Sequence, residues 1–344
     1  MPAMRQILVV APTWVGDAVM AEPLYARLAE RHPGVAIDIF APDWTLPLAR
    51  RMASVRAGIA NPFGHGALRL RDRYRLGKSL AATGYDQAIV LPNSLKSALI
   101  PFFAGIPLRT GFVGEGRYGL LNDARRLDKA ALPTMLGRFC ALAEEAGQPP
   151  PLAQRFPRLV VSAANQAAAR RTYGLSDSRP IVAFCPGAEY GEAKRWPARH
   201  FATLARHWVA KGWQVWVFGS AKDAAVGGQI VSLGGEGVTS LCGRTSLDQA
   251  IDLLGLASAA VCNDSGLMHI AAALNVPLVA LYGSSSPGFT PPLTDKAQIA
   301  SLNLDCSPCF ERTCPQGHLN CLNHLTPDQV WASIDRLPIQ MKPD

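Results

Sequence analysis

The sequence predicts an α/β protein with two domains, each built from alternating strands and helices. Short apolar runs of strand-forming residues recur along the chain, with helix-like segments between them. A chain of 344 residues with 49% hydrophobic content exceeds what a single core usually supports. A proline-rich stretch at residues 148–157 separates two sets of these runs, so we expect it to link the two domains.

The first domain is expected at residues 1–160 and opens with a buried parallel strand. We expect strands at residues 6–11, 36–40 and 87–91, a helix at 18–31, and an apolar helix that ends at 103. Residues 105–123 are rich in Gly and Arg and predict a short strand with long loops. These elements form successive strand–helix units.

The second domain is expected at residues 175–326 and repeats the alternation. A polar, Ala-rich helix at residues 163–173 leads into it. Strands are expected at residues 181–185, 214–218, 237–241, 259–262 and 277–281, with helices between them. A last helix is expected at residues 327–338.

Three polar loops follow strands of the second domain, at residues 186–197, 263–269 and 282–287. In α/β proteins, ligands bind at the carboxyl ends of the strands, where Gly lets backbone N–H groups approach an anion. Lys194 would add a fixed positive charge suited to a diphosphate. Taken alone, the first loop is better explained as an ordinary surface loop with a solvated Lys-Arg pair. The order and spacing of all three loops favour a common ligand site.

Asp223 follows another strand of this domain and permits two readings. An acidic residue just past a strand end can accept hydrogen bonds from the hydroxyls of a ribose. Asp is also a common helix cap. The chain contains neither the G-x-G-x-x-G pattern nor the G-x-x-x-x-G-K-[ST] pattern. A dinucleotide-dependent oxidoreductase and a P-loop ATPase are therefore poorly supported.

Two comparable loops follow strands of the first domain, at residues 12–17 and 92–97. Asp17 lies at the edge of the helix that follows the first loop. A carboxylate there can cap the helix, which contributes about 1 kcal/mol, or act as a general base. Both roles place the Asp17 carboxylate at the carboxyl ends of the strands.

Positive charge is concentrated in the first half of the chain. Residues 1–175 hold 22 Lys and Arg against 12 Asp and Glu, whereas residues 176–344 hold 12 against 14. Such a field attracts nucleic acid, an anionic bilayer or a phosphorylated substrate. No zinc-finger, RNP or helix-turn-helix pattern supports nucleic acid, so we expect no nucleic-acid partner. We interpret the basic run at residues 69–78 as a solvated helix face.

Four motifs in this order resemble the ADP-heptose:lipopolysaccharide heptosyltransferases of glycosyltransferase family 9. They are WVGD at residues 14–17, PNS with KS at 92–97, GA with KRWP at 187–197, and NDSGLMH at 263–269. The resemblance spans nearly the whole chain. It implies a GT-B fold, in which two Rossmann-like domains with parallel sheets face a central cleft. It further implies acceptor binding by the first domain, ADP-heptose binding by the second, and a final helix at 327–338 that packs back on the first domain.

The resemblance also implies an activity. Family members transfer heptose from ADP-heptose with inversion at the anomeric carbon. Residues 102–123 and the Cys-rich segment most resemble the members that add heptose to the first heptose of the Kdo2-lipid A inner core. The implied acceptor, heptosyl-Kdo2-lipid A, is a phosphorylated glycolipid, which suits a basic first domain touching the cytoplasmic leaflet of the inner membrane.

Roles for individual residues are carried over from the matching motif positions. Asp17 is expected to deprotonate the acceptor hydroxyl, and Lys194 to balance the charge on the departing diphosphate. Asp264 is expected to hold the heptose or position Lys194, Asp223 to bind the ribose, and Thr245 to lie beside the adenine. Further donor-site residues are Gly187, Ala188, Glu189, Tyr190, Ser265, Gly266 and His269, although His269 reads equally as a buried structural residue. Acceptor-site residues are Trp14, Gly16, Asn93, Ser94, Lys96 and Arg117.

Four cysteines near the end of the chain permit a metal site. Cys306, Cys309, Cys314 and Cys321 supply enough thiols for structural zinc, but only the first pair has ligand spacing. We favour a reduced, packed loop, and the resemblance implies no metal or cofactor for the chemistry. No run of 18 apolar residues and no signal peptide occurs, so we expect a cytoplasmic chain with reduced cysteines.

Three alternatives are compatible with the same sequence features. A family member that adds the first heptose to Kdo2-lipid A would carry most of the same motifs. A nucleotide-sugar epimerase of the same fold would have a similar donor site but no need for a basic acceptor face. A GT-B shell that only binds a nucleotide or a lipid would need no general base.

Overall fold

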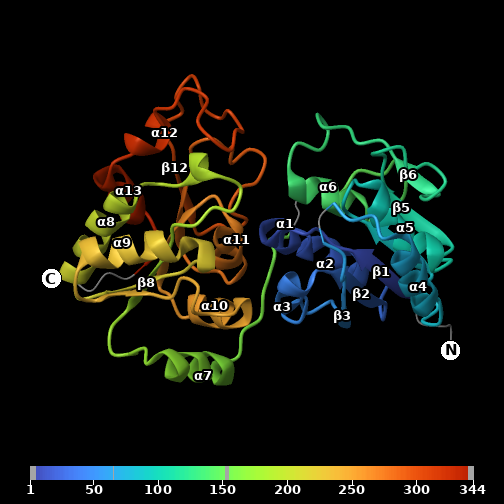
Figure 1. Ribbon diagram of the computed structural model, residues 1–344, viewed down its shortest axis with the longest axis horizontal. Helices are drawn as coiled ribbons and strands as arrows, with labels where there is room; N and C mark the ends of the chain where they lie inside the picture. Colours follow the sequence, from blue (N-terminus) through green and yellow to red (C-terminus); the bar gives the residue numbers. More distant parts are fainter. Residues whose placement is uncertain (1–4, 65, 152–154, 340–344) are drawn as a thin grey trace. The chain divides into compact units, whose positions relative to one another are not determined.

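The computed structural model describes residues 5–64, 66–151 and 155–339. The chain divides into two compact units, residues 1–157 and 158–344 (Figure 1). The predicted linker, residues 148–157, falls at this boundary, and its residues 152–154 lie outside the described residues. Each unit contains a six-stranded parallel sheet with helices on both faces.

The first unit has the strand order β3-β2-β1-β4-β5-β6. This doubly wound order is that of a Rossmann fold. Its strands are β1 (Gln6–Val10), β2 (Ala36–Ala41), β3 (Ala57–Ala60), β4 (Gln87–Val90), β5 (Leu108–Phe112) and β6 (Asp123–Arg125). Its helices are α1 (Val15–Met20), α2 (Glu22–Arg31), the 3-10 turn η1 (Asp43–Thr45), α3 (Leu46–Ala49), α4 (Leu70–Ala81), α5 (Leu95–Phe103) and α6 (Met135–Ala141).

Two details of the first unit differ from the prediction. The single helix expected at 18–31 is two helices, α1 and α2, because Pro23 lacks the N–H that would continue the helical hydrogen bonds. Strands β3 and β6 escaped prediction, because β3 is a four-residue run of mostly weak strand formers and β6 contains two charged residues in three. Both are edge strands of the sheet and are largely exposed or half-buried.

Helices α4 and α5 pack against each other on one face of the first sheet (Figure 1). A Cβ atom at Gly77 of α4 would lie 2.6 Å from the Cβ of Phe103 in α5. The missing side chain therefore permits this close approach. Leu80 of α4 and Ile100 of α5 are buried in the core beneath the pair.

The second unit has the order β12-β11-β10-β7-β8-β9, which repeats the topology of the first. Its strands are β7 (Ile181–Cys185), β8 (Gln214–Val217), β9 (Val238–Ser240), β10 (Ala259–Asn263), β11 (Leu278–Leu281) and β12 (Ala297–Ala300). Its helices are α7 (Ala163–Tyr173), η2 (Glu192–Lys194), α8 (Ala198–Ala210), η3 (Ala221–Asp223), α9 (Ala224–Gly234), α10 (Leu247–Leu254), α11 (Gly266–Ala273), α12 (Asn320–Asn323) and α13 (Pro327–Ile334).

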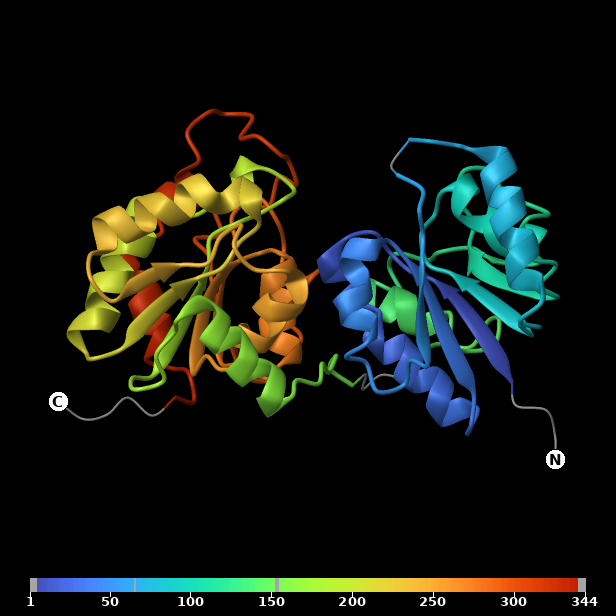
Figure 2. The same cartoon turned by 60° about the horizontal axis from the view of Figure 1, so that its bottom comes forward.

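The core of the second unit lies between its sheet and the layer of α8, α9 and α13, whereas α7, α10 and α11 cover the other face (Figure 2). Val330 and Ile334 of α13 are buried in this core. The prediction placed this helix on the first domain. Within the second unit the helix packs against α8, β11 and β12, because its apolar stripe completes the second core. None of the described helices is long and apolar enough to cross a membrane.

Candidate active site

The centre of the second sheet is the point where its strand order reverses. β7 and β10 lie side by side there, and each continues into one of the predicted loops. Such a reversal leaves room at the carboxyl ends of the two strands, and ligands of doubly wound folds bind in that space. Loops 186–197 and 264–269 therefore occupy the ligand-binding position of the fold.

Lys194 and Asp264 form an ion pair across this point. The distance from Lys194 Nζ to Asp264 Oδ2 is 2.5 Å, although the residues are 70 positions apart in the chain. The Asp264 side chain is 4% exposed and that of Lys194 is 17% exposed. The ammonium also lies 5.1 Å from the centroid of the Tyr190 ring. The carboxylate and the ring hold the Lys194 charge in place before any ligand arrives.

Asn263 connects the two loops through hydrogen bonds of its side chain. It is fully buried at the end of β10, where its Nδ2 donates to the carbonyl oxygen of Pro186 at 2.7 Å. Its Oδ1 accepts a hydrogen bond from the backbone N–H of Trp196 at 3.2 Å. Asn263 belongs to the NDSG motif but was not among the predicted site residues. A polar residue that ends an apolar strand was the signal that could have identified it.

Five buried polar atoms around these loops have no hydrogen-bond partner within the described chain, and one of them is Nε of Arg195, next to Lys194. The other four are Ser265 Oγ, His269 Nδ1, Ser284 Oγ and Ser285 Oγ. A buried polar group without a partner costs about 1–3 kcal/mol. Ser265 precedes the first turn of α11, and Ser284 and Ser285 follow β11. The two latter serines lie in the third predicted loop, although neither was predicted as a site residue. These unused polar groups lie in loops that follow β7, β10 and β11, at the same edge of the sheet as the Lys194 cation.

His269 is buried on α11 close to the ion pair. Burial lowers its pKa to about 4, an effect that the Lys194 ammonium strengthens and the Asp264 carboxylate opposes. The imidazole is therefore neutral at pH 7. A neutral imidazole can still donate one hydrogen bond to a phosphate oxygen. The structure places His269 at the site and leaves its role as a donor contact a prediction.

Asp223 takes part in helix capping, one of the two roles that the sequence left open, as the third residue of a capping box whose N-cap is Ser220. Its Oδ2 accepts hydrogen bonds from the Ser220 backbone N–H at 2.9 Å and from the Ser220 hydroxyl at 2.8 Å. A Cβ atom at Gly187 would lie only 2.5 Å from this oxygen, so glycine is required for the loop to pass. The capping box holds the carboxylate beside the loop after β7. The ribose contact stays a prediction.

The other predicted donor-site residues occupy the rim of the same strand ends. Glu189 is exposed and forms an ion pair with Lys222. The Tyr190 hydroxyl donates to the carbonyl oxygen of Phe310 at 2.7 Å. Ala188 is buried, Gly266 is the first residue of α11, and Thr245 lies half-buried in the turn between β9 and α10.

In the first unit, Asp17 lies in the first turn of α1, directly after β1. A carboxylate there is favoured by the positive end of the helix dipole. Trp14 is the N-cap residue of this helix and is exposed, and Gly16 is half-buried. Trp44, which the sequence analysis did not select, donates through Nε1 to the carbonyl oxygen of Thr13 at 3.0 Å and is also exposed. Two large aromatic side chains thus flank the Asp17 loop.

The loop after β4 lies at the reversal of the first sheet, because β4 neighbours β1. Asn93 is exposed, whereas Ser94, the N-cap residue of α5, and Lys96 are half-buried. These positions agree with the end of the sheet at which an acceptor is expected.

Arg117 does not have the position that the sequence predicted for an acceptor contact. It is 1% exposed, and its guanidinium donates to the carbonyl oxygens of Pro92 at 2.5 Å and Phe112 at 2.6 Å. It also reaches the carbonyl oxygen of Ser94 at 3.3 Å. Burial lowers its pKa to about 10. Arg117 therefore orders the loop after β4 from beneath, since a buried guanidinium must use its N–H groups within the protein.

The four clustered cysteines line one small cavity, together with His318. All four are free thiols. Among the described residues, no three His, Cys, Asp or Glu side chains are arranged to hold a metal ion. Backbone N–H groups, first that of Leu319, lower the pKa of the Cys314 thiol, whereas burial raises that of Cys321.

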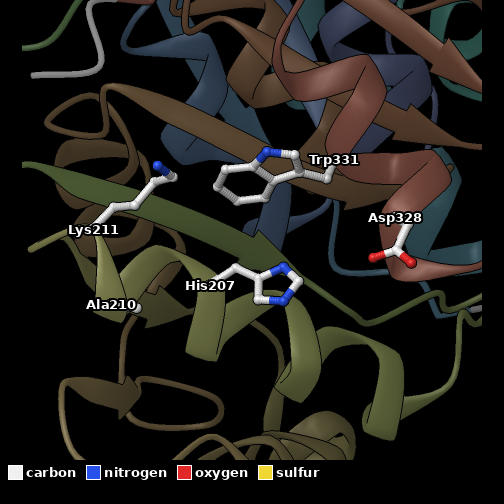
Figure 3. Close-up of a pocket in the computed structure, with 5 residues that line it drawn as sticks. All are labelled: His207, Ala210, Lys211, Asp328 and Trp331. Atoms are coloured by element: carbon white, nitrogen blue, oxygen red, sulfur yellow. The ribbon is translucent and has the colours of Figure 1, made fainter. Parts of the chain in front are cut away.

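A larger hollow in the second unit is distant from these loops in the fold. His207, Ala210, Lys211, Asp328 and Trp331 line it (Figure 3). It lies where α8 ends, just before β8 begins, and therefore at the amino ends of the strands. Ligands of doubly wound sheets bind at the opposite edge. The loops, and not this hollow, are therefore the candidate active site.

Comparisons with known proteins agree with this architecture. Residues 73–320 match the family described as glycosyltransferase family 9 (heptosyltransferase). Lipopolysaccharide heptosyltransferase 2 of Escherichia coli (strain K12) is 47% identical over 344 residues, which cover 97% of this chain and 99% of that protein. Lipooligosaccharide heptosyltransferase 2 of Haemophilus influenzae is 50% identical over 307 residues, 86% of this chain and 88% of that protein.

The solved structure of E. coli ADP-heptose lps heptosyltransferase II has a TM-score of 0.85 at 45% identity. The match covers 96% of this chain and 97% of that one. The predicted fold class, an α/β chain of two Rossmann-like units of the GT-B type, is confirmed. The chain belongs to glycosyltransferase family 9, the heptosyltransferases.

Proposed function

We propose that this chain is an inverting heptosyltransferase that moves L-glycero-D-manno-heptose from ADP-heptose to the first heptose of the Kdo2-lipid A inner core. The Lys194–Asp264 ion pair, set among unpartnered buried serines at the sheet reversal, carries the proposal. This combination suits an anionic diphosphate. The names of the relatives at 47% and 50% identity support the heptose donor and the second-heptose acceptor.

The donor half of the mechanism rests on charge. As the bond from the anomeric carbon to ADP breaks, negative charge grows on the diphosphate. The Lys194 ammonium balances that charge, and the buried hydroxyls of Ser265, Ser284 and Ser285 donate hydrogen bonds to its oxygens. Free backbone N–H groups in the first turn of α11 contribute in the same way. Asp264 keeps the ammonium oriented, because the two groups are already paired.

The acceptor half rests on Asp17. Its carboxylate removes the proton from the acceptor hydroxyl, whose oxygen then attacks the anomeric carbon from the face opposite ADP. We assign acceptor contacts to Trp14, Gly16, Asn93, Ser94 and Lys96, which lie at the carboxyl ends of β1 and β4. The positive charge concentrated in residues 1–175 suits a phosphorylated acceptor.

The cellular setting belongs to the same proposal. The acceptor is a glycolipid of the inner membrane, so the enzyme works in the cytoplasm and makes peripheral contact with the cytoplasmic leaflet. The basic first half of the chain supports this contact.

ADP release tests the proposal directly. The full chain is incubated with ADP-heptose, and release is followed with heptosyl-Kdo2-lipid A, with Kdo2-lipid A, and without acceptor. We expect release with the first acceptor only. Release with Kdo2-lipid A instead identifies a first-heptose enzyme. Turnover of the donor without acceptor supports an epimerase, and no turnover under any condition supports a binding protein.

A further inference from the structure

Helix α4 of the first unit exposes apolar and basic side chains on the same surface. Leu70, Tyr74 and Lys78 recur at every fourth residue and form one stripe along the helix, and Arg71 and Arg75 form a second stripe beside it. Leu70 is 50% exposed and Tyr74 is 49% exposed. The sequence favoured a solvated charged face here. The structure shows large apolar side chains exposed among the cations, which a merely solvated face does not require.

The exposed apolar surface continues onto α5. The Tyr74 and Phe103 rings meet edge to face at 5.4 Å, and Phe102, beside Phe103, is 42% exposed. Cations lie over both exposed rings, with Lys78 Nζ 5.8 Å from the Tyr74 centroid and Arg109 Cζ 5.6 Å from the Phe102 centroid. Long basic side chains arranged in this way cover apolar surface while their charges stay at the rim. We call Leu70, Arg71, Tyr74, Arg75, Lys78 and Phe102 the α4–α5 face.

Charge on this face is not neutralised within the described chain. Asp72, the only acidic residue of α4, is paired with Arg69 at 2.8 Å. No described carboxylate lies within ion-pair distance of Arg71 or Arg75. Like charges four residues apart destabilise a helix. An anionic partner would neutralise Arg71 and Arg75 and so remove their mutual repulsion, whereas water only weakens this repulsion.

We propose that the α4–α5 face docks on a bilayer that contains anionic lipids. Leucine and aromatic side chains enter the boundary between headgroups and acyl chains, while the Arg and Lys side chains bind the anionic headgroups. The proposal rests on the proposed function, since it names the surface through which the enzyme reaches a membrane-held acceptor. It concerns binding alone and can be tested without substrate.

Vesicle sedimentation tests the docking. The full chain is mixed with vesicles of phosphatidylcholine alone or of phosphatidylcholine with phosphatidylglycerol, and the bound fraction is measured at rising salt concentration. We expect binding to the anionic vesicles only, weakening as salt screens the charges. The double variant Arg71→Gln/Arg75→Gln binds about 30-fold more weakly, because each basic residue near an anionic surface contributes about 1 kcal/mol.

Matched variants separate this face from net charge. Arg170→Gln/Arg171→Gln on α7 removes the same charge from the second unit, and we expect it to bind the vesicles like the wild type. Tyr74→Ser/Phe102→Ser weakens vesicle binding, whereas Tyr74→Phe retains it. Equal losses in both arginine variants, or no binding to anionic vesicles, overturn the proposal. A change of oligomeric state without loss of vesicle binding in Tyr74→Ser/Phe102→Ser also overturns it, in favour of an interface between two copies.

A water-soluble acceptor makes the two proposals independent. With a deacylated heptosyl-Kdo acceptor and no vesicles, Arg71→Gln/Arg75→Gln should turn over at the wild-type rate. Heptose transfer by a chain that ignores anionic vesicles refutes the docking face and leaves the activity standing. Vesicle binding by a chain that transfers no heptose refutes the activity and leaves the docking face standing.

Discussion

Replacing Lys194 by Met separates the structural part of its ion pair from the catalytic part. The substitution keeps an unbranched side chain and removes the charge 2.5 Å from Asp264 Oδ2. It leaves a carboxylate that is 4% exposed without its cation. Removing one partner of a buried pair costs about 3–5 kcal/mol, and we expect about 3 kcal/mol because Lys194 is partly exposed.

The double variant Lys194→Met/Asp264→Asn leaves no buried charge at this position. We expect it to recover most of the lost stability, because a buried pair replaced as a whole is often nearly neutral. Catalysis should not recover. Loss of the charge that stabilises the leaving diphosphate lowers kcat by about 100- to 1,000-fold in both variants. The pair of variants thus distinguishes a stabilising ion pair from a catalytic cation.

Urea unfolding followed by tryptophan fluorescence measures the stability. Five of the seven tryptophans lie in the second unit, at positions 196, 208, 213, 216 and 331, so the signal reports mainly on that unit. A loss of 3 kcal/mol shifts the midpoint by about 1 M. Lys211→Met, at the end of α8 away from the site, is the control and should keep the wild-type kcat. Wild-type turnover by Lys194→Met, or a double variant as unstable as the single one, would refute the reasoning.

Three further predictions follow from the site and its surroundings. Asp17→Asn lowers kcat by about 100- to 10,000-fold, measured as the rate of ADP release. The control Asp86→Asn, just before β4 at the amino ends of the strands, leaves this rate unchanged. Equal activity of the two variants would contradict the role of Asp17 as general base. Burial lowers the His269 pKa to about 4, so the unfolded chain binds that proton more tightly, and stability present at pH 7 falls as the pH drops through 6.5. The loss at pH 5 is about 2 kcal/mol in urea unfolding, and an unchanged pH slope in His269→Gln argues against this cause. Iodoacetamide should alkylate Cys314 at a lower pH than an ordinary thiol, because backbone N–H groups lower its pKa, while Cys140, whose pKa burial raises to about 12, should react only after unfolding. Peptide mapping that finds Cys140 modified first rules this out.

The sequence alone determined the central strands and the loops that follow them. β7 was predicted at its observed bounds, and β1, β2, β4, β8, β10 and β11 within one residue at either end. Parallel strands covered on both faces need continuous apolar runs, and these runs are visible without a structure. The polar loops after them were visible for the same reason, since each apolar run stops at Gly, Pro, Asn or Ser.

Tertiary structure decided which of the polar residues meet one another. Lys194 and Asp264 are 70 residues apart, and only the reversal between β7 and β10 brings them together. Ser284 and Ser285 became candidate site residues only because the structure buries their hydroxyls without hydrogen-bond partners. Burial of Arg117 in the first unit likewise shows that this residue supports the loop after β4, whereas the sequence predicted an acceptor contact. A local pattern records whether an element is buried. It does not record which distant residue becomes its neighbour, because that pairing exists only once the sheet has assembled.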